Sequence, residues 1–298
     1  MKKEKRVLAL YLILVFAISF PLEAIWIIYG EAAGGIVGLV MIVPALIAII
    51  LKLVFFRKQR LLGLNIGKPI YYLYAVMIPA VYIGLSYLLY WLFVPGSFSG
   101  TSSIVEAASD VKIMNIQSLP VIIVGAVLFT ILTNIPLTFG EEAGWRGLMY
   151  PIMHKLWGRN KALIISGCVW AVWHLPGIIW GDYNAGAHIL YQIPMFTIST
   201  LSVTVIASWL RVKSGSVWPA ALWHTMHNFL DQGVFRSMTS VGNSTYFISE
   251  TGFITTLFAV FIAVLILVFG KFEKSESDEL SVNIKQKVSE YALGGNNE

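Results

Sequence analysis

Eight apolar segments of about 20 residues each constrain this chain of 298 residues more than any other feature of its sequence. A transmembrane α-helix needs about 20 mostly apolar residues to cross the hydrocarbon core of a bilayer. We therefore predict an all-α, polytopic membrane protein with about eight transmembrane helices. The segments are 7–29, 33–56, 71–94, 119–139, 162–180, 187–210, 216–231 and 252–270. The seventh is short and polar, which makes it the weakest of the eight.

The composition excludes several other classes of protein. The chain is 57% hydrophobic and 12% charged, whereas soluble domains have roughly 25% charged residues. These values exclude an ordinary soluble enzyme, a disordered protein and a secreted disulfide scaffold. The single cysteine, Cys168, permits no internal disulfide and argues against a cysteine-based zinc site. No basic soluble module is visible, so we expect no nucleic-acid partner.

Lysine and arginine residues are distributed unevenly among the predicted loops. One set of loops and the two termini hold Lys2, Lys3, Lys5, Arg6, Arg57, Lys58, Arg60, Lys68, Arg146, Lys155, Arg159, Lys161, Arg211, Lys213, Lys271 and Lys274. The other set holds only Lys112 and Arg236. Because short cytoplasmic loops carry an excess of Lys and Arg, we predict that both termini are cytoplasmic.

The chain divides into one membrane domain and a tail. We predict a single transmembrane helical domain over residues 1–270 and a charged cytoplasmic tail over residues 271–298, which carries four basic and six acidic residues. The loop 95–118 is rich in Ser and Gly and is expected to face outward. The segment 148–157 has the mixed composition of an interfacial amphipathic helix.

Ionisable residues at membrane depth are costly, so each of them suggests a function. Glu141 and Glu142 follow directly on an apolar span, and Arg146 lies four residues after Glu142. Residues i and i+4 on a helix can pair, so we predict an ion pair between Glu142 and Arg146. Glu141 lies about 100° further around the helix and is free to act as a base.

Three further positions carry polar side chains within spans. His174 lies between tryptophans in the span 162–180, and His224 and Asn228 lie one turn apart in the span 216–231. His227 and Asp231 form a second such pair in the same span. Glu23, in the first span, has no partner that the sequence can assign. Such groups need polar partners in lipid, so we expect at least some of these helices to meet.

Together these side chains suggest hydrolysis of a peptide bond. A glutamate can take a proton from water, a histidine can orient that water, and a histidine with an asparagine amide can stabilise an oxyanion. Alternatively, two histidines and a glutamate can bind a zinc ion that activates water. No H-E-x-x-H motif is present. A proton-coupled transporter and a non-catalytic membrane immunity or scaffold protein are the alternatives, although no inverted repeat supports a transporter.

The order of the three motifs resembles a known family. E-E-x-x-x-R (Glu141, Glu142, Arg146), then an aromatic residue four positions before a histidine (Trp170, His174), then H-x-x-x-N (His224, Asn228) is similar to the CPBP family. That family comprises CAAX prenyl endopeptidases and bacterial bacteriocin-processing and self-immunity relatives. The motifs span residues 141–228, and the resemblance covers about half of the chain. Trp170 departs from the commoner phenylalanine, and His227 is an additional histidine.

The resemblance implies an intramembrane endopeptidase with a water-filled cavity open to the cytoplasm. By this resemblance, Glu141 would be the general base and His174 would help to position the water. His224 and Asn228 would bind the oxyanion. Glu142 and Arg146 would support the site. The family is named as metalloproteases, and Glu141, His174 and His224 would be the candidate ligands for Zn²⁺.

The expected substrate is a peptide or protein tethered to the bilayer. The short loops suggest a bacterial plasma-membrane protein, for which peptide maturation and bacteriocin immunity are the usual functions of such relatives. By the resemblance, its active site would face the cytoplasm.

Overall fold

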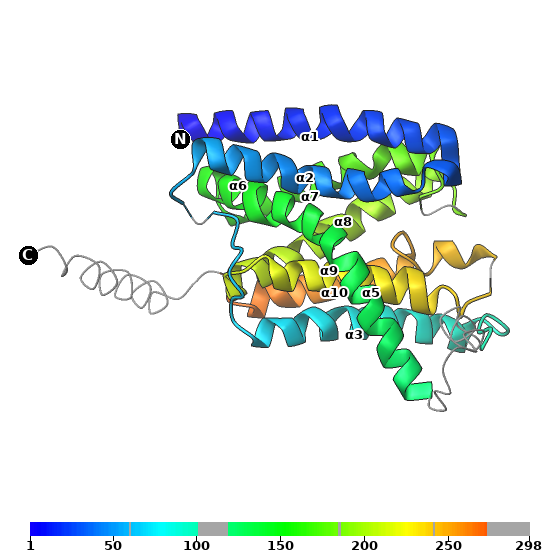
Figure 1. Ribbon diagram of the computed structural model, residues 1–298. Helices are drawn as coiled ribbons and strands as arrows, with labels where there is room; N and C mark the ends of the chain where they lie inside the picture. Colours follow the sequence, from blue (N-terminus) through cyan, green and yellow to red (C-terminus); the bar gives the residue numbers. More distant parts are fainter. Residues whose placement is uncertain (60, 101–118, 184–185, 241, 273–298) are drawn as a thin grey trace, which may run out of the picture.

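A computed structural model describes residues 1–59, 61–100, 119–183, 186–240 and 242–272 of the chain (Figure 1). Over these residues the protein is helical, and they contain one isolated β-bridge and no strand. The expectations for most of the loop 95–118 and for the tail fall outside the described residues. The α-helices are α1 (Lys2–Tyr29), α2 (Gly35–Phe55), α3 (Ile70–Phe93), α5 (Leu119–Glu142), α6 (Tyr150–Trp157), α7 (Arg159–Trp180), α8 (Ile189–Ser214), α9 (Trp218–Asn228) and α10 (Phe253–Phe269). Two π-helical turns, η2 (Ala143–Met149) and η3 (Phe229–Phe235), and two 3₁₀ turns, η1 (Gly30–Ala33) and η4 (Asn243–Tyr246), complete the set.

The all-α, polytopic class predicted from the sequence is confirmed. Five helices among the described residues are long and apolar enough to cross a membrane, namely α1, α2, α3, α7 and α8, and α10 is a shorter apolar helix. Each of the eight apolar segments coincides with a helix, the seventh being α9 continued by η3. The count of eight spans and the cytoplasmic position of the termini remain predictions.

The long helices run between two ends of a bundle (Figure 1). The N-terminus and the last turn of α10 lie at one end, which we call the N-terminal end, and the turn from α1 to α2 lies at the opposite end. α7 packs against α8, α1 against α2, and α3 against α9. α5 crosses the bundle obliquely and contacts both α2 and α9. The helices that carry the three sequence motifs therefore meet in the interior.

Helical structure continues without a break from α5 through η2 into α6. Two glycines let this segment approach α2 closely: a Cβ atom on Gly140 would lie 2.5 Å from the carbonyl oxygen of Met41, and one on Gly144 would overlap Pro44. Small residues at such a spacing bring helix backbones together in membranes. The contact fixes the position of Glu141 and Glu142, which lie between the two glycines.

The predicted amphipathic segment 148–157 corresponds to the end of η2 and to α6. α6 packs against α7 and α1, and its residues Tyr150, Ile152 and Met153 are buried. These side chains belong to the hydrophobic core at the N-terminal end of the bundle. Other members of this core are Tyr11, Trp145, Leu148, Met149 and Leu210, each of which is at most 1% exposed.

Candidate active site

Glu142 is held in a buried network of hydrogen bonds. Its Oε1 atom accepts from Nη1 of Arg146 at 2.9 Å and from Nδ1 of His224 at 3.0 Å. Arg146 also donates to Oγ1 of Thr204 at 3.2 Å, and its guanidinium carbon lies 4.0 Å from the ring centroid of Trp170. Glu142 is 0% exposed and Arg146 2% exposed. The pair expected from the i, i+4 spacing is thus present, and it is joined by a histidine from another helix.

Glu141 points away from this network. Its Oε2 atom accepts a hydrogen bond from Nε1 of Trp170 at 2.8 Å, and its side chain lines a cavity that Glu142 does not reach. The ring of Trp170 stacks on the guanidinium of Arg146, which pairs with Glu142, and its indole N–H donates to Glu141. Trp170 therefore contacts the surroundings of both carboxylates and lies between them. The two adjacent glutamates have different surroundings, as their positions on the helix indicated.

His174 is oriented by its own helix. Its Nδ1 atom lies 2.8 Å from the carbonyl oxygen of Trp170, one turn earlier in α7. A carbonyl oxygen only accepts, so Nδ1 carries the proton and Nε2 of the neutral ring keeps its lone pair. The rings of Trp173, Tyr183 and Phe196 surround the imidazole. These contacts hold the ring in one orientation.

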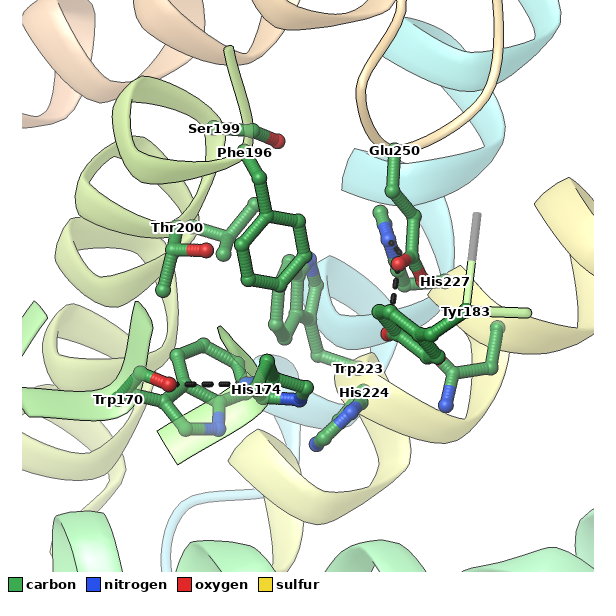
Figure 2. A pocket seen from close by; sticks show the side chains of 12 residues that line it. Trp170, His174, Tyr183, Phe196, Ser199, Thr200, Trp223, His224, His227 and Glu250 are labelled. Carbon is green, nitrogen blue, oxygen red and sulfur yellow. Dashed lines mark hydrogen bonds and ion pairs between the residues drawn. The ribbon is translucent and has the colours of Figure 1, made fainter. Parts of the chain in front are cut away.

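One cavity collects the predicted catalytic side chains. It has a volume of about 170 Å³ and is lined by Glu141 from α5, His174 from α7, and His224 and Asn228 from α9. The remaining lining residues are Glu23, Trp26, Val37, Val40, Met41, Trp173, Gly177, Tyr183 and Gln232. A smaller cavity of about 30 Å³ adjoins it, and Figure 2 shows the rings of His174 and His224 facing this space. The structure thus brings together residues that are up to 87 positions apart, from Glu141 to Asn228.

The π-helical turns follow the two motifs that supply most of this site. η2 begins directly after Glu142 and η3 directly after Asn228. A π turn inserts an extra residue into a helix and is frequent at functional sites. Both motif-bearing helices are therefore irregular where they leave the cavity.

Part of the chain is similar to known CAAX proteases. A family model described as type II CAAX prenyl endopeptidase Rce1-like matches residues 114–230, which include all three motifs. A protein of Methanococcus maripaludis named CAAX prenyl protease 2 is 28% identical over 92 residues, which are 30% of this chain and 34% of that relative. Both matches support the resemblance to the CAAX protease (CPBP) family that the motifs carry. The chain matches about a third of the length of this curated relative.

The metal ligands that the CAAX protease family resemblance implied do not form a ligand set in this structure. Among the residues that the structure describes, no three His, Cys, Asp or Glu side chains come close enough together to hold a metal ion. Trp170 holds one oxygen of Glu141, the carbonyl of Trp170 holds Nδ1 of His174, and Glu142 holds Nδ1 of His224, which are hydrogen bonds that metal-bound side chains also make. The residues as arranged do not fit a zinc ion, and we derive no step through one.

His227, the additional histidine for a CAAX protease family member, belongs to a second polar cluster. Its Nδ1 atom makes a short contact with the hydroxyl of Tyr82, and its Nε2 atom lies 3.6 Å from Oε1 of Glu250. Glu250 also accepts from the hydroxyl of Tyr183 at 2.7 Å and from Nε2 of Gln232 at 2.9 Å. Burial raises the pKa of Tyr183, so its hydroxyl keeps the proton that it donates. We call these five residues the Glu250 cluster.

Two acidic residues near the site were missed or left open by sequence reasoning. Glu250 lies between the seventh and eighth spans, where a single acid in a polar loop gives no signal. Glu23 was assigned no partner, and it lines the large cavity together with Glu141 while being 6% exposed. Oε2 of Glu23 is buried without a hydrogen-bond partner. Asp231, one turn after His227, accepts a hydrogen bond from the hydroxyl of Tyr87 at 3.0 Å.

The large cavity lies towards the end of the bundle opposite the N-terminal end. Three of its lining residues are close to that end: Val37 in the first turn of α2, Gly177 in the last turn of α7, and Tyr183 in the loop that follows. The core around Trp145 and Leu148 fills the N-terminal end. The cytoplasmic termini and the site open to the cytoplasm, both expected from the sequence, remain predictions.

Proposed function

We propose that this protein is an intramembrane endopeptidase of the CAAX protease family that hydrolyses a peptide bond of a membrane-associated peptide or protein. The observation that carries the proposal is the shared cavity. Glu141, His174, His224 and Asn228 line it from three helices, and each is a residue type that amide hydrolysis can use. The match to the Rce1-like family model over residues 114–230 and the name of the Methanococcus maripaludis relative support the same reaction class.

In the first step, water attacks the carbonyl carbon of the scissile bond. Glu141 accepts one proton of that water as the new C–O bond forms, and the carbonyl π electrons move to the oxygen. The lone pair of His174 Nε2 accepts a hydrogen bond from the second water proton. Because Trp170 holds both Glu141 and His174, the two acceptors are fixed relative to each other. The water is thus oriented before the attack begins.

In the second step, the tetrahedral intermediate breaks down. The amide of Asn228 and Nε2 of the protonated His224 ring donate to the oxyanion, while the Glu142 carboxylate serves as the counter-ion of that ring. The C–N bond then breaks, and the leaving nitrogen takes the proton that Glu141 received from water. The products are a carboxylic acid and an amine, and Glu141 returns to its ionised form.

Arg146 and Glu142 act through His224 rather than on the substrate. Glu142 receives hydrogen bonds from both basic side chains. The arginine keeps the buried carboxylate in place, and the carboxylate fixes which ring nitrogen of His224 faces the cavity. We propose that the reaction proceeds by this glutamate-base route without a metal, because the candidate ligands do not gather into a ligand set among the described residues.

The decisive experiment compares the purified wild-type protein with Glu141→Gln on a library of fluorogenic, membrane-anchored peptides. Loss of the general base is expected to lower kcat by about 10²–10⁴-fold. Glu31→Gln is the matched control, because Glu31 is exposed in the turn between α1 and α2. Cleavage by all three proteins at equal rates would contradict the assignment. No cleavage by the folded wild type, together with proton-driven uptake of a solute, would favour a transporter.

A further inference from the structure

We propose that the catalytic cavity opens on the non-cytoplasmic side of the membrane. The substrate would then be the exposed outer segment of an exported, membrane-associated peptide, rather than a cytoplasmic protein tail. The identity of the occupant rests on the proposed endopeptidase activity. The side of access does not, because it follows from where the cavity lies and from how charge is distributed.

The position of the cavity along the helices is the first argument. With a rise of about 1.5 Å per residue, Val37 lies about 3 Å from the start of α2 and Gly177 about 5 Å from the end of α7. Glu23 lies about 9 Å from the end of α1 and about 32 Å from its start. All three reference points lie at the end of the bundle opposite the N-terminus (Figure 1). We call this end the open end.

The exposed members of the lining agree with this direction. Val37 and Gln232 are the exposed lining residues. Gln232 lies in η3, one turn beyond Asn228 along the path of the chain towards the open end. His224 and Glu141, in contrast, are 6% and 2% exposed. The two exposed lining residues therefore lie on the open-end side of the catalytic residues.

The opposite route is filled by packed side chains. On the side of the site that faces the N-terminal end lies the buried ion pair between Glu142 and Arg146. The core of the N-terminal end follows it in the same direction. Its members include Tyr11, Trp145, Leu148, Met149, Met153 and Leu210, all at most 1% exposed. Close-packed interiors of this kind leave no path for a peptide or for bulk water. A substrate can reach Glu141 only from the open end or sideways from the bilayer.

Charge identifies which end faces the cytoplasm. The N-terminal end carries Lys2, Lys3, Lys5, Arg6, Lys52, Arg57, Lys58, Lys68, Lys155, Arg159, Lys161, Arg211, Lys213 and Lys271. Among the described residues at the open end, Arg236 is the one Lys or Arg side chain, and Glu31 and Asp182 are exposed there. An excess of Lys and Arg marks the cytoplasmic side of short loops. The filled end is therefore cytoplasmic, and the cavity opens outward.

The lining also indicates how an outer segment would enter. One wall is apolar and comes from α1 and α2, with Trp26, Val37, Val40 and Met41, and the facing wall carries the polar groups of α7 and α9. An apolar side chain of the peptide fits the first wall, and its backbone amide faces the second. A peptide that remains anchored in the bilayer meets both walls near the outer membrane surface.

Labelling of single cysteines in intact cells tests the side of access. In a Cys168→Ala background, Val37→Cys places a thiol at the rim of the cavity, Glu31→Cys places one at the open end outside the cavity, and Asn65→Cys places one in the exposed loop 56–69 at the filled end. The probe is a membrane-impermeant maleimide, added to intact or permeabilised cells. Maleimides need a hydrated thiolate, so a thiol buried in lipid does not react.

We expect Glu31→Cys and Val37→Cys to be labelled in intact cells and Asn65→Cys only after permeabilisation. The reverse pattern would show that the open end is cytoplasmic and would overturn the proposal. Labelling of Glu31→Cys from outside without any labelling of Val37→Cys would show that the cavity is closed to the outer solution, which would also overturn it. Because no cleavage is measured, a failure of the proposed endopeptidase activity would be seen separately with Glu141→Gln.

Discussion

His224 and His227 lie three residues apart on α9 and belong to two different polar clusters. His224 donates to Glu142, which also binds Arg146. His227 contacts Tyr82 and lies beside Glu250. Both clusters border the cavity of about 170 Å³, but the first contains a permanently charged arginine, whereas the Glu250 cluster combines its histidine with tyrosines, an amide and a carboxylate. Two histidines of one short span thus have different chemical surroundings.

The different surroundings of His224 and His227 indicate different roles for the two clusters. The cluster around Glu142 holds a catalytic ring at the edge of the cavity and leaves its second nitrogen available to substrate. The Glu250 cluster joins α3, α9, η3 and two loops at the open end. Its bonds run between elements that are far apart in the sequence, so its main effect is on stability. Substitutions of the two histidines should therefore separate activity from folding, whereas loss of Arg146 should affect both.

The largest effect is expected for Arg146→Ala. The substitution leaves the carboxylate of Glu142 buried without its cationic partner, and breaking a buried ion pair in this way costs about 3–5 kcal/mol. We expect a sharp fall in folded yield in detergent and a lower midpoint of denaturation, together with lower activity. Lys161→Ala, in the exposed first turn of α7, is the control and should change stability little. Unchanged yield and full activity of Arg146→Ala would contradict the pairing.

The Glu142–Arg146 pair could be predicted from the sequence because it is local. Residues four apart on one helix meet whatever the rest of the fold does. The contact between Glu142 and His224 spans 82 positions, and its existence depends on how α5 packs against α9. From the sequence, contact between these two helices could be expected only because unpaired polar groups are costly in lipid. It did not indicate which of the two histidines would make the contact.

The Glu250 cluster could not be predicted at all. Glu250 and Tyr183 lie in loops between spans, where polar residues are ordinary and carry no signal. The pattern of apolar segments likewise could not predict the side of the membrane on which the cavity opens. Loop charge predicts the orientation of the helices in the membrane, but the depth of the cavity depends on where the core of the N-terminal end stops. That boundary is a property of tertiary packing around Trp145 and Leu148.

The second largest effect compares His224→Gln with His227→Gln. Loss of one oxyanion donor costs about 10²–10³-fold in kcat, so we expect this loss for His224→Gln in the peptide-cleavage assay. His227→Gln should retain activity within a few-fold and should lower the thermal midpoint instead. The pair is matched in chemistry, helix and burial, since both histidines are 6% exposed. Equal losses of kcat in the two variants would show that both histidines act in catalysis.

A smaller effect is expected for Tyr183→Phe. The substitution removes the hydroxyl that donates to Glu250 at 2.7 Å, while Gln232 still donates to the same carboxylate. Loss of a hydrogen bond to a buried charged group costs about 1–3 kcal/mol, and the remaining donor places this variant at the lower end. The measurement is chemical denaturation in detergent. Tyr29→Phe, at the exposed end of α1, is the matched control and should show no change.

A stability loss for Tyr183→Phe as large as that of Arg146→Ala would make the Glu250 cluster the main support of the site. No loss at all would show that the hydroxyl of Tyr183 contributes nothing to the cluster. Because Tyr183 also lines the large cavity, its effect on KM should be measured on the same protein. A change in KM with constant stability would place its role in substrate binding.

The smallest effect is expected on removal of metal ions. Among the described residues, no three His, Cys, Asp or Glu side chains come close enough together to hold a metal ion. We therefore expect wild-type kcat to be unchanged after dialysis against excess chelator and after addition of Zn²⁺, with metal content measured on the same sample. Loss of activity that Zn²⁺ restores would show that substrate or metal rearranges Glu141, His174 and His224 into a ligand set. His174→Ala distinguishes the two routes further, because it should abolish stoichiometric zinc binding only if the histidine is a ligand.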